Sequence, residues 1–272
     1  MRSLLDALHV AFLLARANVR AQLQYRVSFL LGALANLVIT GGELGALWFL
    51  LQRFPNVGGW SFAELSVLYG IGSLSMTFGD ALANGHDLLP LAIKQGTFDR
   101  LLLRPRSVTL QLIAKDFTFR RFGRGVQAVL ALGYGLSQLH VQLAGSPGKL
   151  ALLLASIASG ALVFLGLWIV QAALSFFSVE SLEAMNVLTY GGGELTQYPF
   201  FIYDRWLRAI FVAAAPLALT TYFPCVALLD KLDPLGSSRL FQWCAPGVGP
   251  LFLAATLLVW RFGVQRYTST GS

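Results

Sequence analysis

The sequence predicts an all-α polytopic membrane protein, a single domain over residues 1–272 with six transmembrane helices. Apolar residues make up 56% of the 272 residues, whereas only 12% are charged. A soluble domain carries about twice that charged fraction. The mean hydropathy is +0.65, and one span needs about 20 apolar residues. A chain of this length and hydropathy therefore has room for about five to seven spans.

The first 26 residues are expected to form an amphipathic helix along the membrane surface, in contact with lipids. At 100° per residue, Arg2, Arg16 and Arg20 fall on one helical face, and Leu5 and Phe12 fall on another. A basic face together with an apolar face suits an anionic membrane surface. A soluble helix packed on a partner is less favoured, because a span follows within a few residues. Charged residues interrupt the apolar ones, so no cleavable signal peptide is expected.

Six apolar stretches are predicted to cross the membrane. An ionisable group at that depth is costly and usually faces protein or water. Glu43 in the first span therefore either lines a path or interface, or lies near the outer end and is hydrated. Pro216 and Pro224 are expected to kink or end the fifth span. The six predicted spans cover residues 27–51, 62–83, 126–141, 150–177, 209–229 and 247–262.

The distribution of basic residues predicts that both termini are cytoplasmic. With the N-terminus inside, sixteen of the 20 lysines and arginines lie in inside segments and four lie outside. This bias is large enough to fix the orientation, and it accounts for the net charge of +7 without nucleic-acid binding. Cys225 and Cys244 then flank the outside segment 225–246. They either form a disulfide there or remain free buried thiols.

Two polar segments are expected on the cytoplasmic side. Residues 84–107 join the second and third spans and include LLPLAIKQGTFDRLLLRPR, in which apolar and charged side chains alternate. Pro90 suits a first helical turn and Pro105 a stop. We expect a short helix here, which either binds a soluble partner or lies on the membrane without one. Residues 179–208 contain three consecutive glycines and precede the fifth span.

These features resemble those of permease subunits of type-2 ABC exporters, over essentially the whole chain. The pattern G-x-x-D-x-L-L-x-x-P, formed here by Gly96, Asp99, Leu101, Leu102 and Pro105, is similar to that family's coupling segment. The stretch VESLEAMNVLTYGGGELTQYPFFIYDRWLR resembles a bacterial subgroup in which consecutive glycines and a Tyr-Pro precede the fifth span. The resemblance implies a location in the bacterial cytoplasmic membrane.

The resemblance also implies a non-catalytic subunit, which pairs with a second copy or a related permease and binds two separate ABC ATPase subunits. The chain has no Walker motif, so ATP and Mg would be bound by the partner and no cofactor is expected here. Residues 225–246 would fold back towards the membrane. Candidates for the substrate path, or for helix packing instead, are Asn36, Thr40, Glu43 and Asp80. The expected ATPase contacts are Lys94, Gly96, Phe98, Asp99, Arg100, Leu101, Leu102, Arg104 and Pro105.

Two other classes of membrane protein fit the sequence less well. An intramembrane enzyme acting on lipids needs a nucleophile with a positioned base, or metal ligands. His9, His86 and His140 are scattered, and neither GxSxG nor HExxH occurs. An ion-coupled secondary transporter is expected to contain inverted repeats, and the sequence has no visible internal repeat. GSPGKL lacks the spacing of a phosphate-binding loop.

Overall fold

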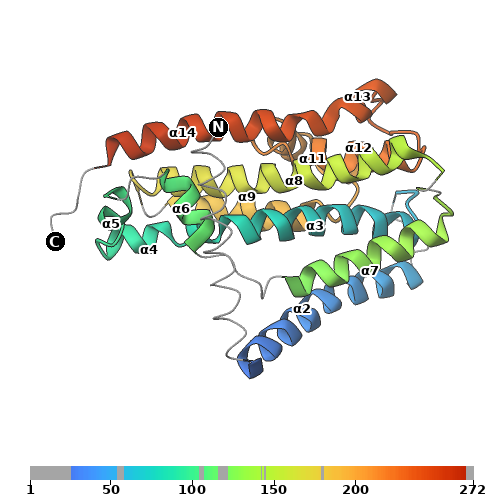
Figure 1. The fold of residues 1–272 in the computed structure, drawn as a ribbon. Helices are drawn as coiled ribbons and strands as arrows, with labels where there is room; N and C mark the ends of the chain where they lie inside the picture. Colours follow the sequence, from blue (N-terminus) through green and yellow to red (C-terminus); the bar gives the residue numbers. More distant parts are fainter. Residues whose placement is uncertain are drawn as a thin grey trace.

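The computed structural model describes residues 26–53, 58–103, 107–115, 122–141, 143, 145–178 and 181–267. The amphipathic helix expected at the N-terminus lies outside these ranges, apart from residue 26. Helices make up the regular structure of the described residues, and no strand occurs among them (Figure 1). The prediction of an all-α protein is confirmed.

Five long helices coincide with five of the six predicted spans. In the described part of the chain, two stretches are long and apolar enough to cross a membrane, Pro147–Leu174 and Arg239–Arg266, and a bent helix pair would be a third. The second stretch joins α13 (Arg239–Cys244), η4 (Ala245–Gly247) and α14. The five long helices are α2 (Arg26–Arg53), α3 (Phe62–Asp87), α7 (Phe122–Gln138), α8 (Pro147–Leu174) and α14 (Val248–Arg266).

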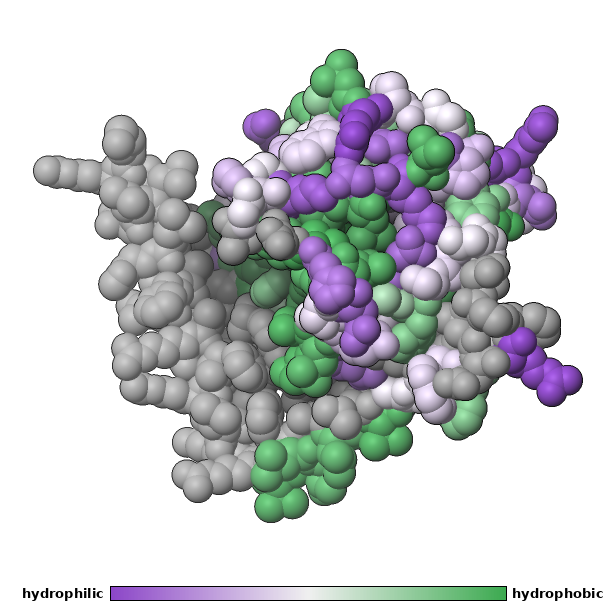
Figure 2. Space-filling view, turned by 90° about the vertical axis from the view of Figure 1, so that its right-hand side faces the viewer, coloured by the Kyte–Doolittle hydropathy of each residue, from purple (hydrophilic) through white to green (hydrophobic). Residues whose placement is uncertain are grey.

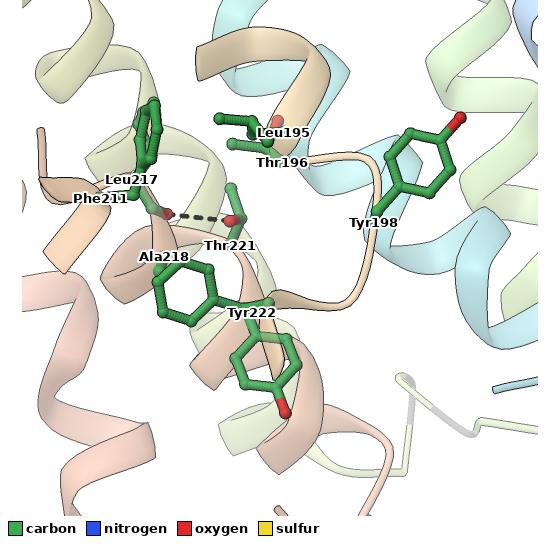
Figure 3. Close-up of a pocket in the computed structure, with 9 residues that line it drawn as sticks. Leu195, Thr196, Tyr198, Phe211, Leu217, Ala218, Thr221 and Tyr222 are labelled. Carbon is green, nitrogen blue, oxygen red and sulfur yellow. Dashed lines mark hydrogen bonds between the residues drawn. The ribbon is translucent and has the colours of Figure 1, made fainter. Parts of the chain in front are cut away.

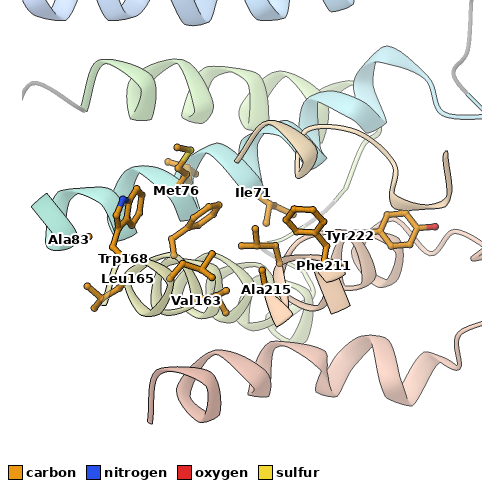
Figure 4. Packing of buried hydrophobic residues seen from close by; sticks show 14 of the residues in the cluster. Ile71, Met76, Ala83, Val163, Leu165, Trp168, Phe211, Ala215 and Tyr222 are labelled. Atoms are coloured by element: carbon orange, nitrogen blue, oxygen red, sulfur yellow. The ribbon is translucent and has the colours of Figure 1, made fainter. Parts of the chain in front are cut away.

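The central helix is α3, and glycines on its surface let its neighbours approach closely. A Cβ atom on Gly79 would lie only 2.6 Å from the Phe164 Cβ of α8. Gly85 lies directly against the backbone of Leu112 in α6 (Val108–Lys115). Figure 4 shows the apolar side chains of α3 and α8 meeting in the core between these helices.

The direction of each helix defines two ends of the bundle. Gly79 of α3 packs on Phe164 of α8. Nearer the C-termini of both helices, Gln171 of α8 donates a hydrogen bond to Asp87 of α3, so α8 runs parallel to α3. α14 runs parallel to α8, since Gly249 lies on Ser159 and Gly263 lies on Ala173. We call the end with the N-termini of these three helices the Glu64 end, and the opposite end the His86 end.

α7 runs antiparallel to α3, and α2 lies on the outside of the bundle. Gly125 of α7 lies on Thr77, whereas Gly135 of α7 lies on Ala63. α2 packs mainly on α7, which separates it from most of the other helices (Figure 1). The described side chains of α2 are largely exposed and apolar, as expected of a helix that faces lipid.

The described part of the segment 179–208, residues 181–208, passes through the bundle, so the predicted placement of the whole segment at one end is wrong. α9 (Ser181–Leu195) begins at the His86 end, where the Tyr190 hydroxyl donates a hydrogen bond to Asp87. Thr196 then lies against Gly72 near the middle of α3. Phe201, in the short 3-10 helix η2 (Phe200–Ile202), reaches Gly58 at the Glu64 end.

The polar groups of this segment are bonded inside the protein, which is why it can lie within the bundle. Thr196 donates a hydrogen bond to the Gly193 carbonyl oxygen at 2.7 Å. The Tyr203 hydroxyl donates to the Leu195 carbonyl oxygen at 3.1 Å. Gly193 contributes no side chain and lies directly on Met76. Buried polar groups cost little when they are hydrogen-bonded.

The predicted fifth span, residues 209–229, is not one continuous helix. Two helical arms meet at the break next to Pro216, with a bend of 72°, where the sequence predicted a kink. The preceding Phe201 and the following Lys231 both lie at the Glu64 end, by contacts with Gly58 and Glu64. Residues 205–228 therefore form a hairpin. Its elements are α10 (Arg205–Ala209), the π-helix η3 (Ile210–Ala214), α11 (Leu217–Thr220) and α12 (Tyr222–Leu228).

The tip of the hairpin reaches the middle of the bundle. Phe211 and Leu217, on either side of the break, lie on Gly192 of α9. Thr220 lies close to Gly160 in α8. Residues 225–246 were expected to fold back towards the membrane, whereas in the structure residues 205–228 form the hairpin. Cys225 is a buried free thiol and Cys244 an exposed one, so the disulfide considered above is absent.

Candidate functional site

The segment expected to contact an ATPase forms two short helices at the His86 end. These are α4 (Leu89–Lys94) and α5 (Asp99–Leu102), where the sequence predicted one helix. Gly96 lies in the turn between them with φ +63°, a conformation that glycine adopts without strain. The turn folds α5 back, so that only some of its side chains face outwards.

Burial divides the seven described residues among the nine expected contacts into buried, half-buried and exposed groups. Phe98 is fully buried and Leu101 is 6% exposed, so both side chains point into the protein. Leu102 is 40% exposed, and the next residue, Leu103, is 85% exposed. Lys94 and Arg100 are also exposed, while Gly96 and Asp99 are half-buried. Arg104 and Pro105 lie outside the described residues.

A network of charged groups closes the Glu64 end. The Lys231 ammonium group lies 2.6 Å from a Glu64 carboxylate oxygen, 2.7 Å from the Gly59 carbonyl oxygen and 4.9 Å from the Trp60 ring centroid. Glu64 also accepts a hydrogen bond from the Ser61 backbone, in the capping box that begins α3. The chain after the hairpin is thereby attached to the N-terminus of α3.

A second group of ion pairs extends this network. Lys149 lies 2.5 Å from Asp230, and Arg239 pairs with the same carboxylate. The Tyr222 hydroxyl donates to Asp233 at 2.7 Å. Figure 2 looks onto this end and shows hydrophilic side chains gathered across it, with apolar ones at the lower edge. This network was not predicted from the sequence. Its one local signal is the Ser61-x-x-Glu64 pattern.

Removal of the Lys231 charge is expected to destabilise the protein. In Lys231→Met, Glu64 loses a largely buried partner, so the free energy of unfolding should fall by about 1–3 kcal/mol. The measurement is thermal unfolding in detergent. Arg239→Met is the matched control, because its 66% exposed side chain pairs at the surface, where an ion pair contributes less than about 1 kcal/mol. Equal losses in the two variants would contradict the prediction.

A pocket lies between the hairpin and the end of α9, at the Glu64 side of the bundle (Figure 3). It encloses about 240 Å³, including its mouth. Thr221 donates a hydrogen bond to the Leu217 carbonyl oxygen at 2.9 Å, and the hydroxyls of Thr196 and Tyr222 are also bonded within the protein. The wall is therefore apolar in character. Its lining residues are Leu195, Thr196, Tyr198, Phe200, Phe211, Leu217, Ala218, Thr221 and Tyr222.

Comparison with known families decides the identity of the chain. A family model described as ABC-2 family transporter protein matches residues 37–271, which include every helix described above except the first turns of α2. The chain belongs to the ABC-2 transporter family. It is thus an integral membrane protein and the permease component of an ABC transporter, which associates with ABC ATPase subunits. Searches of the curated proteins and of the solved structures give no match.

The residues expected to line a substrate path lie on two helices of this ABC-2 permease. Asn36, Thr40 and Glu43 belong to α2, and their side chains are outside the described part. Asp80 is buried within the central helix α3. α2 packs mainly on α7, and a substrate path lined by these four residues stays a prediction. Among the described residues, no group of three or more His, Cys, Asp and Glu side chains is placed to hold a metal ion.

At the His86 end of the ABC-2 permease, two ionisable groups lie beyond the predicted second span. His86 is fully buried, its ring nitrogens have no hydrogen-bond partner, and its ring lies edge-on to Trp260. The neighbouring Asp87 accepts hydrogen bonds from Gln171 and Tyr190.

Proposed function

We propose that this chain is the permease subunit of an exporter, and that it moves a substrate out across the bacterial cytoplasmic membrane with ATP hydrolysed by a separate subunit. The observation that carries the proposal is the shape of the α4–α5 segment. Leu102 and Leu103 are exposed on α5 and its C-cap, while Phe98 and Leu101 fix the same segment to the bundle. Exposed leucines beside charged groups suit a protein partner.

The proposed topology places the His86 end in the cytoplasm. The six crossings are then α2, α3, α7, α8, the segment from α9 to Tyr203, and α14. The hairpin enters from the outer side and returns to it. Arg205 and Arg208 move to the outer side, which changes the count of basic residues from sixteen and four to fourteen and six. The bias keeps its sign.

Pairing of charges at the Glu64 end supports this orientation. Lys149, Lys231 and Arg239 each pair with a carboxylate there. At the other end, Lys94 and Arg100 are exposed, so that water in the cytoplasm would hydrate their charges. Like other permeases of this kind, the chain is proposed to act as a dimer, with a second copy or a related permease.

Two experiments test the proposal. Purification of the tagged chain from its native membrane should recover an ATPase subunit, and the complex in lipid vesicles should hydrolyse MgATP. Cysteines at Gln95 and Ser237, each in a Cys244→Ser background, should react differently with a membrane-impermeant maleimide in intact cells. Labelling of Ser237→Cys alone supports the topology. Labelling of Gln95→Cys alone would overturn it, and the absence of any ATPase would overturn the function.

A further inference from the structure

One of the buried side chains that hold the coupling segment (84–107) from inside is that of Phe98. Phe98 lies in the turn between α4 and α5 and is fully buried. Its ring centroid lies 5.3 Å from that of Phe176 and 4.9 Å from that of Tyr267, with the Tyr267 ring edge-on. Phe176 directly follows the end of α8, and Tyr267 is the C-cap of α14. The segment is therefore packed on the ends of two helices to which it is not adjacent in sequence.

These contacts belong to a larger aromatic cluster, which we define as His86, Phe98, Phe176, Trp260 and Tyr267. The Phe176 ring also lies 5.5 Å from the rings of Trp260 and Tyr267. The Trp260 ring in turn lies 5.5 Å from the His86 ring of α3. Burial and then the carboxylate of Asp99, the first residue of α5, raise the pKa of the Tyr267 hydroxyl.

α14 connects this cluster to the hairpin at the other end. It has 19 residues, so it is about 28 Å long at 1.5 Å per residue. At its far end, the Gly249 amide donates a hydrogen bond to Ser159 at 3.0 Å. α13 precedes it, and the Phe241 ring of α13 lies 5.0 Å from the Phe223 ring of the hairpin. At one end, α14 thus contacts the coupling segment. At the other end it is joined to α13, which contacts the hairpin.

We propose that Phe98 is a positioning residue that transmits displacement of the coupling segment to α14, and through α14 and α13 to the hairpin. This inference rests on the proposed function. It replaces the simpler expectation that force passes only along the chain into α3 and the third span. A packed aromatic contact can transmit a displacement as well as fix a position, because the protein interior is densely packed and has a low compressibility. The coupling segment is also joined to α3 directly along the chain, through Leu88, but this connection leads to no helix other than α3.

The test uses the native Cys244, which is exposed on α13, whereas Cys225 is buried. The complex of permease and co-purified ATPase is labelled with an environment-sensitive fluorescent maleimide in lipid vesicles. Fluorescence is then recorded on addition of MgATP with vanadate, and hydrolysis of MgATP is measured separately. A Cys244→Ser complex gives the background from the ATPase cysteines.

Phe98→Leu is expected to keep the ATPase bound and hydrolysing while the fluorescence change becomes smaller by about fivefold or more. Phe177→Leu is the matched control, because this neighbouring side chain is exposed, and it should keep the wild-type signal. Tyr267→Leu alters the opposite side of the contact at the half-buried end of α14, so it decides the question even if Phe98→Leu does not fold. In the double variant Phe98→Leu and Tyr267→Leu, the fluorescence change should be no smaller than in either single variant, since both substitutions remove the same contact.

A wild-type signal that persists in Tyr267→Leu and in folded Phe98→Leu would overturn the inference. Loss of ATPase binding in Phe98→Leu would overturn it as well, because Phe98 would then belong to the docking surface. The absence of any nucleotide-dependent signal in the wild type, with hydrolysis intact, would mean that motion does not reach α13. A wild-type preparation without ATPase would instead count against the proposed function.

Discussion

Replacement of Leu102 and Leu103 by aspartate is expected to release the ATPase subunit from the permease. Both leucines are exposed at the His86 end, where the proposed partner would cover them. Burial of one leucine contributes about 1.5–3 kcal/mol. The loss of two such contacts corresponds to a fall in affinity of about 100-fold or more, and two new carboxylates add a desolvation cost.

The measurement is the amount of ATPase that co-purifies with the tagged double variant from native membranes. Leu232→Asp is the matched control, since this leucine is 92% exposed but follows the hairpin at the Glu64 end. It should retain the ATPase. Leu101 is left unchanged, because it is buried and its replacement would disturb the fold itself. Normal recovery of the ATPase with the double variant would exclude Leu102 and Leu103 from the docking surface.

Replacement of Gly79 by valine is expected to destabilise the permease more than any surface change. A Cβ atom at this position would lie 2.6 Å from Phe164 Cβ and 2.9 Å from the Ala161 carbonyl oxygen. A backbone oxygen cannot move aside as a flexible side chain does, so α3 and α8 must separate. We expect a loss of about 3 kcal/mol or more in the free energy of unfolding, with further loss as other contacts of α3 open.

Thermal unfolding in detergent measures this effect. Gly133→Val in α7 is the control, because no atom lies within 4 Å of a Cβ atom placed there. That variant should unfold close to the wild-type temperature. If the two valine variants unfolded at the same temperature, the tight packing of α3 on α8 would not contribute to stability in the way described.

Hydropathy was sufficient to predict α2, α3, α7, α8 and α14, because each is a continuous apolar helix. It failed for residues 179–208, since their hydrogen bonds within the protein cannot be read from composition. It also failed for the hairpin, because an apolar stretch of 20 residues has the same hydropathy whether it crosses a membrane or turns back half-way. Of the two prolines expected to kink or end this span, Pro216 marked the position of the turn, whereas Pro224 lies within α12.

The coupling segment was found from its motif, but the orientation of its side chains was not. α4 has six residues and α5 has four, which is too short for a helical periodicity to separate an inner from an outer face. Phe98 was therefore grouped with the contact residues, although it is buried. The charged network at the Glu64 end was missed because Lys231 and Glu64 are 167 positions apart.

The outlying position of α2 has a consequence for biosynthesis. Among the described helices, α2 is the first to emerge from the ribosome, yet its main neighbour, α7, begins 69 positions after Arg53. At about 5–20 residues per second, synthesis of that interval takes on the order of 10 s. During this time α2 resides in the bilayer without its final partner. Its lipid-facing leucines and valines keep it soluble in the bilayer until α7 arrives, so assembly of this pair is a late event that follows insertion.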